Sequence, residues 1–218
     1  MKKIHIDIVS DIACPWCAIG YGRLKQAMEQ LAPEYEFTVE WRAFELNPDL
    51  SWKGEPILPA LARKYGRSEE ELRATQNDMM IIARDLGINF EKIQERFTCN
   101  TFDAHRLVKW AGEQGRQTAM KQAFFEAYFG KAEDVSDHDV LIRCVEAVEL
   151  DTEKAREVLN SDQYARTVRE EEATYQQAGI TSVPAFVINS KYLVSGAQEP
   201  SVLVQTLREI AAESGVGS

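Results

Sequence analysis

Residues 4–20 read IHIDIVSDIACPWCAIG, an apolar stretch that runs directly into Cys14-Pro15-Trp16-Cys17. Ile4, Ile6 and Ile8 recur with a period of two, which predicts a first β-strand. After the motif, apolar side chains recur at helical spacing as far as Leu31 and stop before a proline, which predicts a helix over 18–31. The two cysteines therefore stand where a strand ends and a helix begins.

This position gives the two cysteines a specific chemistry. Thiols three positions apart lie on one side of a first helical turn, close enough to form a small-ring disulfide. The amides and the positive dipole end of a helix N-terminus stabilise a thiolate on Cys14, and Pro15 suits the first helical position because its missing N–H would have no partner there. We expect Cys14 to be the nucleophile and Cys17 the resolving thiol of a redox pair.

Two other uses of a Cys-x-x-Cys pair are disfavoured. Half of a zinc site would need a second pair of ligands, but Cys99 and Cys144 are isolated and the sequence has no His-x-x-x-His pair, so no metal is expected. A purely structural disulfide would close a very short loop, which removes little entropy from the unfolded chain.

The composition limits the class of protein. The chain has 218 residues, 44% of them hydrophobic, which is enough to form a substantial core. It has 25 Lys and Arg against 35 Asp and Glu, and this net charge of −10 argues against nucleic acid or an anionic membrane as partner. The sequence has no apolar stretch of the length of a signal peptide or a membrane span, so we expect a cytoplasmic protein. In a reducing compartment cysteines rest as thiols, and a Cys-x-x-Cys pair is then typical of catalysis or redox sensing, with no cofactor beyond the pair itself.

The remaining pattern predicts an interrupted α/β fold. A second strand is expected over 37–44, the signals from 50 to 178 are almost wholly helical, and a hairpin over 183–195, turning at Asn189-Ser190, precedes a last helix over 199–212. We therefore predict a thioredoxin-like domain formed by 1–49 and 179–218, with an all-helical insertion over 50–178. Within the insertion the predicted helical segments are 56–66, 72–86 after a capping box of Ser68 and Glu71, 101–110, 116–128, 140–148 opened by Ser136 and Asp139, 152–159, and 163–178 closed by Gly179.

Three stretches carry a family resemblance: VSDIACPWCAIG at 9–20, NTFDAHRL at 100–107 and ITSVPAFVINSKYLVSGAQ at 180–198. Over essentially its full length the chain resembles the FrnE-like branch of the DsbA superfamily. The resemblance implies a thiol-disulfide oxidoreductase with a thioredoxin-like fold, and a cis peptide bond between Val183 and Pro184 facing the cysteines. Without the resemblance this bond would be expected to be trans, because only about 5–6% of the peptide bonds before proline in folded proteins are cis.

Substrate binding is expected beside the motif. A proline at the start of a strand would leave the backbone of Val183 free to pair with an extended substrate segment, although Pro184 could also merely cap the strand. Trp16 is expected to offer an apolar face to substrates. Because Pro15-Trp16 supplies no positive charge to Cys14, we expect weaker oxidising power than that of DsbA.

Two carboxylates and a histidine are candidate auxiliary groups. Asp7 and Asp11 share the strand parity of Val9, and either could exchange a proton with Cys17, the alternative being a solvated or turn-capping carboxylate. His105, in the second family-like stretch, either lines the substrate cleft or is a hydrogen-bonded structural group.

The two isolated cysteines have different expected roles. Cys99 could be a redox partner if the insertion folds over Cys14, and otherwise is a small buried hydrophobe. Cys144 falls on an apolar helix face and is expected to be core.

The favoured function is therefore dithiol-disulfide exchange with protein or small-molecule thiols and disulfides, glutathione being a possible thiol partner, and the sequence makes no prediction of oligomeric state. One rival is a glutathione-dependent isomerase or transferase similar to 2-hydroxychromene-2-carboxylate isomerases and kappa-class glutathione transferases, which normally have serine where this chain has Cys14. The other is a chaperone-like binding module whose helical cap holds unfolded chains and whose cysteines are incidental.

Overall fold

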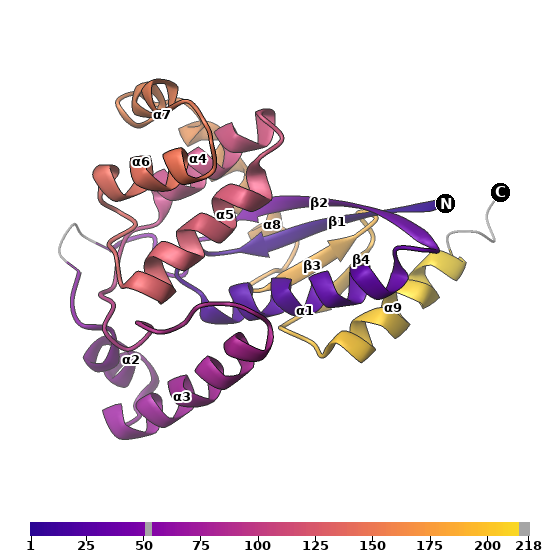
Figure 1. Cartoon of the computed structure of the whole chain (residues 1–218), viewed down its shortest axis with the longest axis horizontal. Helices are drawn as coiled ribbons and strands as arrows, with labels where there is room; N and C mark the ends of the chain where they lie inside the picture. The colour runs from indigo at the N-terminus through magenta and orange to yellow at the C-terminus, as the bar shows by residue number, and fades with distance from the viewer. Residues whose placement is uncertain (51–53, 214–218) are drawn as a thin grey trace.

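The computed structural model describes residues 1–50 and 54–213, and their centre is a four-stranded mixed sheet (Figure 1). Its strands are β1 (Lys2–Ser10), β2 (Tyr35–Ala43), β3 (Ala185–Ile188) and β4 (Tyr192–Ser195), in the order β2-β1-β3-β4. The inner strand β1 runs parallel to β2 and antiparallel to β3, and β3 forms the hairpin with β4. The predicted turn at Asn189-Ser190 is confirmed, since both residues have positive φ.

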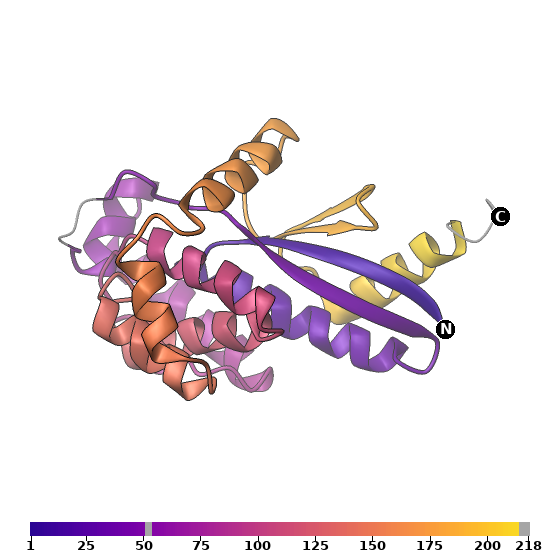
Figure 2. The same ribbon diagram turned by 90° about the horizontal axis from the view of Figure 1, so that it is seen from above.

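Helices cover both faces of the sheet. Figure 2 shows α1 (Pro15–Leu31) and α9 (Pro200–Glu213) on one face and α8 (Ala165–Gln177) on the other. Ile4, Ile6 and Ile8 are buried in the core that includes α1, whereas Val9 belongs to a smaller cluster with Phe44 that packs against α8. A strand buried on both faces needs apolar residues on both parities, which β1 has in its second half.

The helices between β2 and β3 gather where β1 ends and α1 begins (Figure 1). One core cluster runs from β1 and α1 into these helices, joining Ile8 and Trp41 to Phe124 and Leu141. Their bounds are α2 Ile57–Tyr65, α3 Glu69–Asp85, α4 Phe102–Glu113, α5 Gln117–Phe125, a π-helical turn Glu126–Gly130, α6 His138–Ala147 and α7 Thr152–Leu159, followed by α8. A thioredoxin-like α/β domain with a helical insertion is thus confirmed, while residues 51–53 and 214–218 of the predicted ranges lie outside the described residues.

Local signals at several helix ends are confirmed. Ser68 and Glu71 form the reciprocal capping box before α3, with the Ser68 hydroxyl accepting from the Glu71 N–H at 3.2 Å and the Ser68 N–H donating to the Glu71 carboxylate at 2.9 Å. Gly179 follows α8 with φ +86°, the left-handed conformation that glycine adopts without strain.

Several predicted boundaries differ from the structure, and the predicted helix over 116–128 is α5 followed by the π-helical turn. Two of the differences have a clear local cause. The N-cap of α6 is Asp137, whose carboxylate accepts from the Asp139 N–H at 2.7 Å, because the hydroxyl of Ser136 is already bonded to Asp134. Strand β3 begins at Ala185, because the cis peptide bond before Pro184 falls where the sequence predicted the strand to start. No helix among the described residues is both long and apolar enough to cross a membrane.

Candidate active site

The two motif cysteines lie on the first turn of α1. Cys14 is its N-cap, Pro15 is at the first helical position, and the Cys17 N–H donates to the Cys14 carbonyl at 3.1 Å. Both are free thiols, with Cys14 5% and Cys17 0% exposed. The predicted place of the pair at a helix N-terminus is confirmed, and Cys14 is the one of the two that solvent reaches.

The loop before β3 closes over the same helix turn. The Val183–Pro184 bond is cis, as the family resemblance implied, and the Cys14 thiol donates to the Val183 carbonyl at 3.7 Å. The close approach depends on Gly20, because a Cβ there would lie 2.9 Å from Pro184 Cγ. The fold therefore brings the start of α1 and the Val183-Pro184 loop, some 170 residues apart in sequence, into contact.

The environment of Cys14 opposes ionisation. The hydrogen bond between the two thiols, burial and the nearby Asp11 carboxylate together raise the pKa of Cys14 well above its usual value. Stabilisation of a thiolate by the helix N-terminus was expected, but in the dithiol the pKa of Cys14 moves the other way. In the dithiol form Cys14 rests as a neutral thiol.

Asp11 is the centre of a buried polar cluster behind the thiols. It is 1% exposed and accepts hydrogen bonds from the N–H of Ala13 at 3.2 Å, the N–H of Leu46 at 2.7 Å and the hydroxyl of Thr101 at 2.8 Å. Burial alone would raise its pKa, but His105 and the Leu46 N–H outweigh that cost and lower it. Asp11 therefore keeps its charge near Cys14.

His105 belongs to this cluster. Its ring nitrogen Nε2 lies 3.1 Å from the Phe44 carbonyl and 3.5 Å from Asp11 Oδ1, and the side chain is 2% exposed. Burial and the charge of Lys121 lower its pKa, so the ring is neutral near pH 7. This is the hydrogen-bonded structural placement that was one of the two expectations for His105.

Lys121, from α5, is a functional candidate that the sequence analysis missed. Its side chain is fully buried, donates to the Ser10 carbonyl at 3.2 Å and lies over the rings of Trp41 and Phe125 at 5.3 and 5.6 Å. Burial lowers the pKa of Lys121 to about 8, opposed chiefly by Cys17 and Asp11. The sequence carries little signal of this burial, because Lys121 stands between Met120 and Gln122 and helical lysines are ordinarily exposed.

A cavity of about 910 Å³ opens beside Cys14. It is lined by the motif residues Cys14 and Trp16, by the loop residue Val183 and by side chains of α2 and α3. Cys99 lines the same cavity, so the insertion does bring this thiol to the space that Cys14 faces. Trp16 is 38% exposed at its edge.

The family now follows from comparison with known proteins. A sequence model of the DSBA-like thioredoxin domain matches residues 5–208. The chain belongs to this family. A probable DsbA oxidoreductase from Streptomyces coelicolor has a similar structure, with 36% identity, a TM-score of 0.88 and coverage of 94% of this chain and 89% of that one.

Two further proteins are similar to this chain at lower sequence identity. YwbO, an uncharacterized protein of Bacillus subtilis, is 27% identical over 198 residues, which are 89% of this chain and 91% of that protein. A 2-hydroxychromene-2-carboxylate isomerase has a TM-score of 0.72 with 14% identity, covering 98% of this chain and 99% of the isomerase. That likeness shows a shared fold alone.

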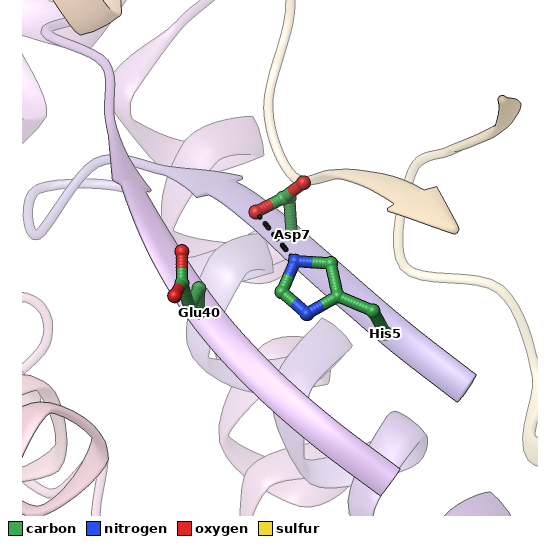
Figure 3. A group of neighbouring side chains, drawn as sticks. All are labelled: His5, Asp7 and Glu40. Carbon is green, nitrogen blue, oxygen red and sulfur yellow. Dashed lines mark hydrogen bonds and ion pairs between the residues drawn. The ribbon is translucent and has the colours of Figure 1, made fainter. Parts of the chain in front are cut away.

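Asp7 lies apart from the thiols. On β1 it accepts from Arg42 Nε at 2.6 Å and lies 3.1 Å from His5 Nε2, close to Glu40 (Figure 3). No hydrogen bond or ion pair joins Asp7 to either motif cysteine in the described part of the chain, although Asp11 does approach them.

The same group has the residue types of a metal site. His5, Asp7 and Glu40 could each offer a ligand atom within 4.8 Å of the others. The guanidinium of Arg42 already forms ion pairs with both carboxylates and with Glu171 of α8, so the positive charge that a cation would supply is present. The arrangement fits an ion-pair network between the sheet and α8.

Cys144 is remote from the cavity. Its thiol donates to the Ala123 carbonyl at 3.8 Å, and the residue is buried within α6.

Proposed function

We propose that this protein is a thiol-disulfide oxidoreductase that cycles Cys14 and Cys17 between dithiol and disulfide. The observation that carries the proposal is the placement of Cys14 at the N-terminus of α1 with its sulfur against the Val183 carbonyl and beside a large cavity. Membership of the DSBA-like family supports an oxidoreductase, and the FrnE-like branch remains our sequence-based prediction within it.

The reaction we propose has two exchange steps. The Cys14 thiolate attacks one sulfur of a substrate disulfide, so a mixed disulfide forms and the other half leaves as a thiolate that takes up a proton. The Cys17 thiolate then attacks the Cys14 sulfur, forms the Cys14–Cys17 disulfide and releases the second thiol. The substrate gains two electrons and the pair loses them, to be restored by a partner thiol such as glutathione.

Disulfide reduction is the direction we favour. A strongly oxidising pair owes its potential to a reduced form stabilised by a low thiolate pKa. Pro15 and Trp16 supply no positive charge to Cys14, and burial and the Asp11 carboxylate act against a thiolate there, so we expect this dithiol to donate electrons more readily than a strongly oxidising pair does. A cytoplasmic location, which we also propose, would keep the pair reduced between turnovers.

Substrates would enter the cavity along the Val183 backbone. Trp16 offers an exposed apolar face at one edge, and the half-buried Val183 lies next to the nucleophile, where an extended segment could pair with its backbone. Both features suit a disulfide carried on a peptide or on a small thiol.

A redox titration tests the proposal. The protein is equilibrated in glutathione buffers, quenched with acid and analysed by mass spectrometry for the Cys14–Cys17 disulfide. We expect a potential nearer to that of thioredoxin, about −270 mV, than to that of DsbA, about −120 mV. In cells, Cys17→Ala should accumulate mixed disulfides on Cys14, and Cys14→Ser should form none.

The same variants separate the rival functions. Glutathione-dependent turnover that survives Cys17→Ser would favour an isomerase or transferase. An unchanged ability of Cys14→Ser to hold unfolded chains, with no exchange activity in the native protein, would favour a binding module.

A further inference from the structure

Arg96 is a buried cation without a counter-ion. It lies in the loop that connects α3 to α4, is 2% exposed, and its guanidinium stacks over the rings of Tyr128 and Phe129 at 5.3 and 5.2 Å. One guanidinium nitrogen donates to the Ile93 carbonyl, while Nε has no hydrogen-bond partner. Across residues 1–50 and 54–213 no carboxylate forms an ion pair with Arg96.

The groups nearest to Arg96 do not neutralise it. Besides the aromatic rings these are Tyr128, Cys99 and Cys14, and burial raises the pKa of Tyr128 and of Cys99, as the Cys17 hydrogen bond and burial raise that of Cys14. All three are neutral near pH 7. A buried charge is costly unless it is paired, and aromatic faces recover only part of that cost.

Arg96 lines the cavity that contains Cys14. At about 910 Å³ the cavity is in the range of small-molecule sites, which run from about 300 to 1,000 Å³. Its described lining residues also include Arg63, Lys64 and Arg67 and one acidic residue, Glu55, which forms an ion pair with Arg63. In a protein of net charge −10 this is a local excess of positive charge.

We infer that the cavity binds small disulfides that carry a carboxylate, with Arg96 pairing to the carboxylate while a disulfide sulfur reaches Cys14. The inference rests on the proposed function and names its substrate class. An anion at Arg96 would supply the missing counter-charge, and a guanidinium–carboxylate pair is among the strongest polar contacts that proteins form. The exchange itself is the two-step reaction described above.

A charge series of substrates tests this inference. The reduced protein, freed of reductant, is mixed with an excess of glutathione disulfide, of the neutral bis(2-hydroxyethyl) disulfide or of the cationic cystamine. Acid quench and mass spectrometry then give the second-order rate constant for formation of the Cys14–Cys17 disulfide. No recycling partner is needed, because each protein turns over once.

Arg96→Met is expected to slow the reaction with glutathione disulfide about 10-fold or more and to leave the neutral disulfide within about 2-fold, since a charge-assisted contact is lost with one substrate alone. Arg96→Lys should recover part of the rate. Arg166→Met, which removes the same charge from a 90% exposed side chain on α8, should change no rate. Comparing substrates within one variant cancels any general loss of folded protein.

Two outcomes overturn the inference. An equal loss with all three disulfides would mean that Arg96 acts on the thiols and not on the substrate. Unchanged rates with glutathione disulfide would mean that Arg96 meets no substrate. If instead the native protein reacts with none of the disulfides, the proposed function fails. Calorimetry then still tests the anion site: S-methylglutathione should bind the Cys14→Ser variant, and adding Arg96→Met should weaken that binding.

Discussion

The Cys14 sulfur is held as a thiol by its immediate neighbours. The Cys17 hydrogen bond and burial favour the protonated form, and the Asp11 carboxylate adds a negative charge that a thiolate would face. Exchange needs the thiolate, so the same neighbours slow attack at neutral pH and make the dithiol a better electron donor.

Replacing Asp11 by asparagine should therefore lower the pKa of Cys14, because a negative charge near its sulfur is removed. Thiolate absorbance at 240 nm against pH measures the change. The substitution should also destabilise the fold by about 1–3 kcal/mol, since Asp11 accepts from Ala13, Leu46 and Thr101. Asp7→Asn is the matched control, and an equal shift of the Cys14 pKa by both variants would contradict the placement of Asp11.

Lys121 makes stability depend on pH. Its pKa is lowered from 10.5 to about 8 by burial, so as pH falls from about 10.5 to 8 the unfolded chain takes up a proton that the folded chain does not. The native protein therefore loses stability over that window, by on the order of 3 kcal/mol at about 1.4 kcal/mol per pH unit, and the loss is complete below 8.

Denaturant unfolding at pH 7–10.5 measures this. The native protein should gain stability relative to Lys121→Met as pH rises from 8 to 10.5, and the difference between the two should be flat from 7 to 8. A difference that stays constant across the whole range would show that Lys121 titrates normally.

At the scale of elements, the contact of α1 with the Val183-Pro184 loop depends on Gly20. A Cβ at that position would meet Pro184 Cγ at 2.9 Å and Phe186 at 3.3 Å, both in well-packed surroundings. Gly20→Ala should cost about 1–3 kcal/mol and slow exchange by Cys14, because α1 must move away from the loop. Gly112→Ala, where the nearest atom is Gln117 Nε2 at the ordinary contact distance of 3.4 Å, should instead leave activity unchanged and stabilise α4 by up to about 1 kcal/mol.

Sequence could predict the elements whose signals are local. The capping box of Ser68 and the turn at Asn189-Ser190 depend on neighbouring residues alone, so the structure agrees with the prediction there. The π-helical turn at 126–130 could not be predicted, because its Phe129 carbonyl accepts from the distant Lys92 N–H at 3.0 Å and Tyr128 donates to the Phe97 carbonyl. Such a turn is set by tertiary contacts.

For the whole molecule, the residues of the site also fall into those placed by local sequence and those placed by tertiary contacts. The place of Cys14 on a helix N-terminus follows from adjacent residues, and the cis bond at Pro184 from a family motif. Asp11 and Thr101 meet across 90 positions, and Lys121 reaches Ser10 across 111, so no local pattern reveals them. Burial of a charged side chain is decided by the packing of the insertion on the sheet.

The packing of the insertion on the sheet predicts that the whole molecule unfolds cooperatively. Because a single core cluster includes β1 and α1 as well as α4 to α7, the insertion and the thioredoxin-like part should unfold together. Leu141→Ala in α6, a fully buried site, should cost about 2–5 kcal/mol and speed hydrogen exchange at the β1 amides as much as in α6. Leu193→Ala, at a 52% exposed site on β4, should change neither. Faster exchange confined to α6, with β1 protected as before, would show that the helical part opens alone and that the shared core does not couple the two parts.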